Sequence, residues 1–158
     1  MSIRNLRLFL AFAAAMTGSA LAQTTTTTRT SSYSFPLVGL ASTETIGVNL
    51  INLAANTTSG TAASCTGTVA FVNSSGTTIG TATPFTLTAD AATSVTLAFS
   101  SSGLTSLRGL IRAVLTSTDT SNVPCALSTT LNTYDTTTGV THVFLAGPSV
   151  QSGPNFGH

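Results

Sequence analysis

Apolar and polar side chains alternate along much of this chain, which is the period of a β-strand with one buried face. Two of the clearest alternations each begin at a cysteine: Cys65, Gly67, Val69 and Phe71, and then Cys125, Leu127, Thr129 and Leu131. Because every second residue of a strand lies on the same face, each cysteine shares a face with the apolar residues that follow it. We therefore expect both cysteines to point into a common core.

Further segments show the same period and are separated by turn-forming residues. The globular part begins at 35–38, where Pro36 favours an edge or the start of a strand. The expected strands are 45–53, 65–72, 77–81, 85–88, 95–99, 107–115, 125–134 and 140–145. About eight short strands at this regular spacing are typical of a sandwich or a barrel. The sequence predicts an all-β fold, a single antiparallel β-sandwich that is immunoglobulin-like in the loose sense and carries one disulfide.

Two segments depart from simple alternation. Within 45–53 the apolar residues change face after Leu50, which predicts a bulge or a bend between Asn49 and Asn52. The segment 107–115 is apolar on both faces. It fits a central strand, and a short helix is the alternative, which a glycine and the β-branched residues disfavour.

Residues 1–22 have the three parts of a secretory signal peptide. Arg4 and Arg7 supply a positive start, 8–16 is a short apolar run, and 20–22 has the small-x-small form that signal peptidase accepts. We expect cleavage before Gln23 and a secreted protein in the periplasm, at the cell surface or in the extracellular space. The apolar run is shorter than the roughly 20 residues that cross a bilayer, so we expect no membrane span in the mature chain.

The predicted sandwich domain covers 35–146 and is flanked by two segments of different composition. Residues 23–34 are nearly all threonine and serine, which cannot bury enough apolar area to offset the entropy of ordering. We expect a flexible leader there, either bare or carrying O-linked sugars. Residues 147–158 contain two prolines and three glycines and are expected to form a flexible C-terminal tail.

Cys65 and Cys125 are the only two cysteines, so one intramolecular pairing is available. Export to an oxidising compartment permits that disulfide. Closing the long loop between them would stabilise the fold by about 4 kcal/mol in the chain-entropy model. Two free thiols in the core are the alternative, which is uncommon outside the cytosol.

Charge is scarce, at 6% of residues against the quarter or so that is usual in soluble domains. Removal of the signal peptide leaves three arginines against four acidic residues, and the chain has no lysine. A nucleic-acid-binding protein needs a basic stripe to neutralise phosphates, so we exclude nucleic acid as a partner.

Few residues offer catalytic chemistry. His142 and Asp135 could join a serine in a hydrolytic triad, but the sequence has no nucleophile elbow. Glu44 is the only glutamate, and the aspartates fall in predicted turns, which disfavours the paired carboxylates of a glycosidase. No segment offers the six to eight oxygens that calcium takes. We expect no catalytic residue, no metal site and no cofactor.

Exposed aromatic rings are the usual contact surface of sugar-binding sandwiches, because a ring packs against the apolar face of a sugar. Four phenylalanines follow the core alternation and are expected to be buried: Phe71, Phe85, Phe99 and Phe144. Tyr134, beside a predicted turn, is left as the one candidate platform. Together with His142 of the closing strand it forms the candidate binding patch.

A strand ending in asparagine and leucine, the run CTGTVAF at 65–71, a glycine turn, CAL at 125–127 and YDTTTG at 134–139 resemble small secreted bacterial β-sandwich proteins known only as hypothetical exported proteins. The wider resemblance is to immunoglobulin-like sandwiches, from which the chain departs by having no tryptophan and by having Val123 where a tyrosine corner would lie. Chaperone-assembled pilins also combine one disulfide with a threonine-rich sandwich, but the leader 23–34 lacks the alternating apolar residues of a donor strand.

These features favour a non-enzymatic role as a secreted structural or adhesive protein of the extracellular space or the cell surface. A glycan- or protein-binding β-sandwich module that uses Tyr134 and His142 is the alternative, and a hydrolase comes third. The scarcity of charge leaves strand edges poorly protected against pairing, so the expected partner is a second copy of this chain or, alternatively, an extracellular glycan or protein.

Overall fold

The computed structural model describes residues 28–54, 64–119, 125–147 and 150–151. They form ten strands and one short 3₁₀ helix. In chain order these are β1 (Arg29–Ser34), β2 (Val38–Ala41), β3 (Glu44–Asn52), β4 (Cys65–Asn73), β5 (Thr78–Leu87), β6 (Ala92–Ala98), η1 (Phe99–Ser101), β7 (Arg108–Asp119), β8 (Ala126–Asp135), β9 (Thr141–Ala146) and β10 (Val150–Gln151).

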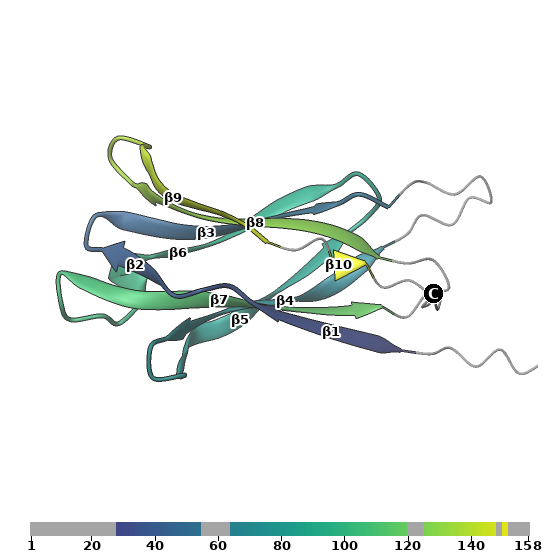
Figure 1. Cartoon of the computed structure of the whole chain (residues 1–158), viewed down its shortest axis with the longest axis horizontal. Coiled ribbons are helices and arrows are strands. Elements are labelled where there is room, and N and C mark those ends of the chain that lie inside the picture. Colours follow the sequence, from purple (N-terminus) through teal and green to yellow (C-terminus); the bar gives the residue numbers. More distant parts are fainter. Residues whose placement is uncertain (1–27, 55–63, 120–124, 148–149, 152–158) are drawn as a thin grey trace, which may run out of the picture.

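The strands form two antiparallel sheets that pack face to face (Figure 1). Sheet A has the order β5-β4-β7, and β1 and β2 pair one after the other along the remaining edge of β7. Sheet B has the order β6-β3-β8, and β9 and β10 share the remaining edge of β8 in the same way. The prediction of an all-β antiparallel sandwich is confirmed.

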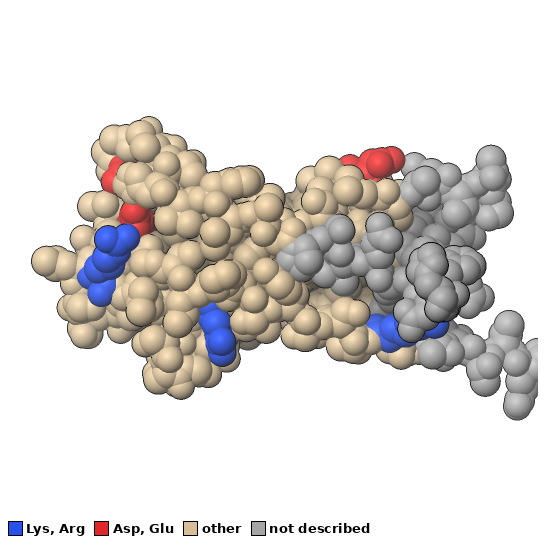
Figure 2. All heavy atoms as spheres, in the orientation of Figure 1, with Lys and Arg blue, Asp and Glu red and all other residues tan. Residues whose placement is uncertain are grey.

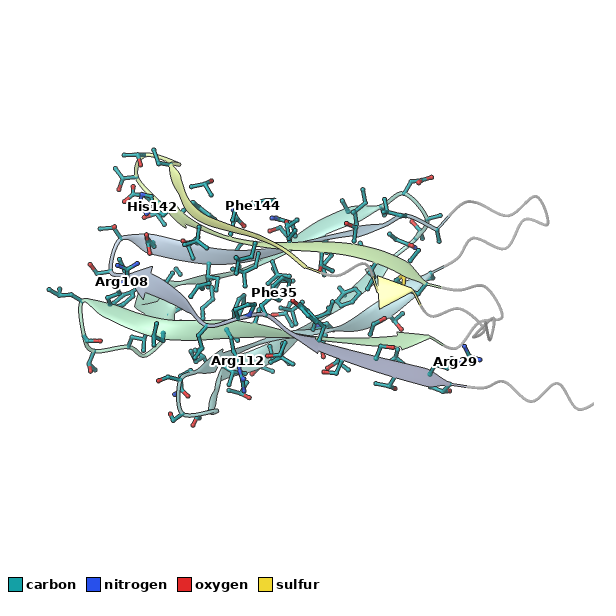
Figure 3. All side chains as sticks on the ribbon, viewed as in Figure 1. Arg29, Phe35, Arg108, Arg112, His142 and Phe144 are labelled. Atoms are coloured by element: carbon teal, nitrogen blue, oxygen red, sulfur yellow. A yellow bond between two sulfur atoms is a disulfide. The ribbon has the colours of Figure 1, made fainter. Side chains whose placement is uncertain are left out.

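The core lies between the sheets and follows the alternation of the sequence. Every second residue from Ile46 to Leu50 in β3 and from Ile111 to Leu115 in β7 is buried. Phe35, between β1 and β2, is also buried and lies between the two layers (Figure 3). Burying one side chain of this size contributes about 1.5–3 kcal/mol, so these rows are the main force that holds the sheets together.

The predicted disulfide joins the two sheets. Cys65 is the first residue of β4 in sheet A, and Cys125 directly precedes β8 in sheet B. Both residues are buried and their Cα atoms lie 5.2 Å apart. The alternative of two free thiols is therefore excluded.

The predicted bulge between Asn49 and Asn52 is wrong. β3 keeps an unbroken register with both of its neighbours, and Leu50 and Asn52 point into the core while Ile51 points out. The strand tolerates a buried asparagine because its Nδ2 donates to the carbonyl of Leu87 and its Oδ1 accepts from the amide of Ala54. Bulges occur instead in β5, opposite Val69 to Phe71 of β4, and in β9, opposite Thr133 and Tyr134 of β8.

The flexible leader predicted for 23–34 is wrong for β1, which pairs along the second half of β7. Threonine and serine suit this edge strand, and Tyr33 packs edge-on against Phe35 with ring centroids 4.9 Å apart. The flexible tail predicted for 147–158 is likewise wrong for Val150–Gln151, which pair with β8. Residues 1–27, including the predicted signal peptide, lie outside the described residues, as does Val123.

The structure also decides between strand and helix for 107–115 and corrects the boundaries of the strands expected at 77–81 and 85–88. The region 107–115 is a strand, because it lies at the start of β7 between β2 and β4, where both of its faces are partly covered. The separate strands expected at 77–81 and 85–88 are one strand, β5. Within the described residues, no helix is long and apolar enough to cross a bilayer.

Candidate functional site

The outer face of sheet B is an uncharged surface built from four cross-strand rows. The register places Tyr134 with Thr45 and Ala98, Phe144 with Asn132, Gly47 and Thr96, Ala146 with Thr130, Asn49 and Ser94, and Ser128 with Ile51 and Ala92. These side chains point away from the core because the alternate positions of the same strands are the buried ones. None of the four rows contains an acidic or a basic residue. Figure 2 views the sandwich from the edges of its two sheets, where the charged residues form a few separate groups.

Two amides and a hydroxyl are already linked across the centre of this face. Nδ2 of Asn49 on β3 donates to Oγ1 of Thr130 and to Oδ1 of Asn132 on β8, both at 3.2 Å. These bonds fix the orientation of both asparagine side chains. Oδ1 of Asn49 then remains as an acceptor and Nδ2 of Asn132 as a donor for a molecule on the surface.

Phe144 lies directly across from Asn132 and is 64% exposed. The sequence interpretation placed this ring in the core, and that prediction is wrong. The register shift between β8 and β9 adds a residue near His142, so Val143 and Leu145 face the core and Phe144 faces solvent. The outcome is an exposed aromatic ring beside a polar amide.

Tyr134, the predicted aromatic platform, also lies on this outer face. Its Cε1 atom is 3.8 Å from the position that a Cβ on Gly47 would occupy, so the ring covers the glycine. The side chain is partly buried and shows less of its ring than Phe144 does. Tyr134 therefore forms one border of the surface.

The opposite end of the face is hollowed. A shallow concavity of about 360 Å³ lies over β8, β3 and β6. It is lined by Asn49, Leu50, Ile51, Ala92, Thr93, Ser94, Ser128 and Thr130. The lining is neutral, and its polar groups are hydroxyls and one amide.

His142, the second residue of the predicted patch, has a different environment from Tyr134. Its Nδ1 forms a hydrogen bond with Oε1 of Glu44, whose other carboxylate oxygen accepts from the amide of Ala41 at 2.7 Å. Glu44 is 4% exposed, whereas the His142 side chain is about half exposed. Figure 3 shows His142 and Arg108 at the same end of the sandwich.

The environment of Glu44 keeps its carboxylate ionised. Burial acts to raise the pKa of Glu44, but the hydrogen bonds from His142 and Ala41, with the charges of His142 and Arg108, outweigh it and lower the pKa. A buried carboxylate must find such partners because an unpaired buried charge is costly. The Glu44–His142 pair thus has a structural explanation, which ties β9 to β3 at the end of the sandwich.

Asp135, the third group considered for catalysis, has a turn role. Its Oδ1 accepts from the amides of Thr137 and Thr138 and from the Thr138 hydroxyl. The Thr138 amide, the Thr43 side chain and the Thr137 amide lower the pKa of Asp135 to about 2. These contacts shape the turn between β8 and β9.

The part of the chain that the structure describes contains no group of three histidine, cysteine or acidic residues placed to hold a metal ion. The side chain of Asp119 and residues 120–124 lie outside what is described.

Comparison with protein-family models, with curated proteins and with solved structures gave no significant match.

Sequence reasoning missed the main features of the outer face. The alternation of β8 could have revealed Thr130 and Asn132 on the side opposite to the core residues. The exposure of Phe144 depends on a bulge that no turn residue marks, and the pairing of Glu44 with His142 joins residues that are far apart in the chain.

Proposed function

We propose that this chain is a secreted, non-enzymatic adhesive protein of the extracellular space or the cell surface, and that the outer face of sheet B makes the adhesive contact. The observation that carries the proposal is Phe144, a 64% exposed ring directly across from Asn132 on a surface without charge. Exposed apolar residues set among polar groups are typical of interaction surfaces.

The chemistry of this face suits a neutral, hydroxyl-rich partner such as a polysaccharide. The ring of Phe144 offers an apolar plane for the C–H face of a sugar. Nδ2 of Asn132 and Oδ1 of Asn49 offer one donor and one acceptor whose positions are fixed by the bonds between these residues. A charged partner would form no ion pair with the four rows, because none of their residues is acidic or basic.

Two further observations support export. Residues 1–22 have the form of a secretory signal peptide. The disulfide between Cys65 and Cys125 is compatible with an oxidising compartment, where such bonds persist.

The test is binding of the mature, oxidised protein to insoluble neutral polysaccharides and to protein-coated surfaces, measured as depletion from solution. We expect retention on at least one neutral polysaccharide, and Phe144→Ala and Asn132→Ala to weaken it by about tenfold each.

The matched control is Leu107→Ala, which removes an apolar side chain that is 84% exposed but lies outside the outer face of sheet B. This variant should bind as the unmodified protein does. Equal losses in Phe144→Ala and Leu107→Ala would overturn the assignment of the surface. If the protein were retained on the protein-coated surfaces alone, its partner would be a protein and not a glycan.

A further inference from the structure

The free edges of the two sheets differ in how well they are protected against pairing with another strand. An edge strand presents unpaired N–H and C=O groups, which natural proteins protect with proline, charge, bulges or short length. In the described residues, sheet A ends at β5 on one side and at β1 and β2 on the other, and sheet B ends at β6 and at β9 and β10.

Three of these four edges are interrupted. β5 contains Pro84, has Gly80 in the left-handed region at φ +67°, and pairs with β4 across a register shift. The edge formed by β1 and β2 breaks at Pro36 between the two strands. The edge formed by β9 and β10 contains a bulge, and β10 has only two residues.

β6 has none of these features. It pairs with β3 through seven consecutive residues, from Ala92 to Ala98, without a register shift. Its sequence, ATSVTLA, contains no proline, no glycine and no charged residue. Every second residue of such a strand turns its backbone N–H and C=O away from the paired neighbour. β6 therefore presents a straight row of backbone donors and acceptors at the end of sheet B.

We propose that β6 pairs antiparallel with β6 of a second copy of this chain, so that sheet B continues through both molecules of a two-fold symmetric dimer. The unpaired backbone N–H and C=O groups of an open strand edge are satisfied by the same groups of another open strand edge. Among the described strands β6 is the one uninterrupted edge, and an isologous dimer uses the same surface of both copies.

The side chains of β6 are compatible with pairing to themselves. An antiparallel pair of β6 strands centred near Val95 sets small, uncharged or β-branched residues opposite one another, which are favourable cross-strand neighbours. Asp90, the exposed acid just before β6, would lie at opposite ends of the seam in the two copies and so causes little repulsion. Leu97, which is partly exposed at the border of the core, would gain cover from the second strand.

The proposed dimer adds a second adhesive face to the contact that a single molecule makes. It places the outer faces of the two copies of sheet B next to each other on one continuous surface. A partner with repeating units could then engage both faces, which raises the apparent affinity without any new contact. Because one strand pair buries little area, we expect a dissociation constant in the micromolar range.

The test is sedimentation velocity of the mature, oxidised protein from low micromolar to near millimolar concentration. We expect a monomer that converts to a dimer. Thr96→Lys puts two like charges near the two-fold axis of the seam and should weaken dimerisation by about tenfold or more. The control is Thr86→Lys, the same change on the exposed face of edge strand β5, which should leave the dimerisation constant unchanged.

Hydrogen exchange of the unmodified protein gives an independent readout that does not need a variant. Peptides that cover β6 should become more protected as concentration rises, whereas peptides that cover β5 should not. A monomer at every concentration, or equal effects of the two lysine substitutions, would overturn the proposal. Because Thr96 lies in the same outer-face row as Phe144, adhesion without the dimer is tested with the unmodified protein diluted below its dimer dissociation constant. Polysaccharide binding by that monomer would show that adhesion stands without the dimer, and loss of binding by a dimeric Phe144→Ala protein would show that the dimer forms without adhesion.

Discussion

The Glu44 carboxylate on β3 and the His142 ring on β9 form a hydrogen-bonded pair that spans the end of the intervening strand β8. Glu44 is buried, and its second oxygen is held by the amide of Ala41 in sheet A. A single carboxylate thereby connects β9, β3 and β2 at one end of the sandwich. The pair gives this end a stability that depends on pH.

We expect Glu44 to stabilise the fold at neutral pH and to lose that effect in acid. Because the folded-state pKa of Glu44 is lowered, its contribution is fully present above the unfolded pKa and disappears as pH falls through the folded pKa. His142→Ala should cost about 1–3 kcal/mol at pH 7, since it leaves the buried carboxylate with fewer partners. Urea unfolding of both proteins at pH 7 and at about pH 3 measures this, and the difference should shrink at the lower pH.

The control for this pair is Asp90→Asn, which changes an exposed carboxylate in the turn before β6 and should alter stability by less than about 0.5 kcal/mol at pH 7. An equal loss in Asp90→Asn and His142→Ala would show that general charge, and not the pair, sets the pH dependence.

The disulfide should contribute strongly to stability because it closes a loop with a sequence separation of 60 residues and joins the two sheets. We expect the Cys65→Ala, Cys125→Ala double variant to be less stable by about 4 kcal/mol. Guanidinium unfolding of the oxidised protein, the reduced protein and the double variant measures this. Because reduction removes the same link, the last two should agree, and a loss below about 1 kcal/mol would contradict the chain-entropy account.

Asn52 is a buried polar side chain whose amide bonds the carbonyl of Leu87 and the amide of Ala54. Asn52→Ala leaves these backbone groups without that partner and should cost about 1–3 kcal/mol in thermal or chemical unfolding. Asn49→Ala, on the exposed face of the same strand, is the matched control and should cost much less. If Asn49→Ala were the more harmful of the two, the burial argument for β3 would be wrong.

The sequence predicts the fold well where one strand alone carries the signal. The alternation in 65–71 and 125–131 predicts that both cysteines lie in the core and form a disulfide, and the structure confirms both predictions. These inferences succeed because the two-residue period of a strand is local and because two cysteines allow one pairing.

The same local rule fails where a neighbouring strand decides the outcome. Asn52 interrupts the apolar pattern of β3, yet it keeps an inward position because Leu87 and Ala54 satisfy its side chain. β1 is a strand because β7 offers an edge, although its serines and threonines predict a flexible leader. Phe144 faces solvent because of a bulge against β8. Most of the candidate surface therefore depends on strand pairing that no single segment reveals.

Gly67, near the start of β4, shows how closely two strands and a ring approach one another in sheet A. A Cβ atom built on this residue would lie 2.1 Å from the carbonyl oxygen of Thr116 on β7, and 2.7 Å from the ring of Phe85 on β5. The carbonyl belongs to the backbone of a central strand, so it cannot move without disturbing the sheet. The Phe85 ring covers the space that a side chain at position 67 would otherwise fill.

Gly67→Ala should therefore destabilise the fold by about 1–3 kcal/mol, the usual cost of overpacking a core. Gly47→Ala is the matched control, because the three atoms nearest to a Cβ there all belong to side chains, the closest being Oδ1 of Asn132 at 3.0 Å. We expect a smaller effect from Gly47→Ala, since alanine also restricts the unfolded chain and offsets part of the contact. Chemical unfolding of both variants measures the difference. Comparable stability of the two would mean that β4 and β7 separate easily at this point, contrary to the close approach of Gly67 and Thr116.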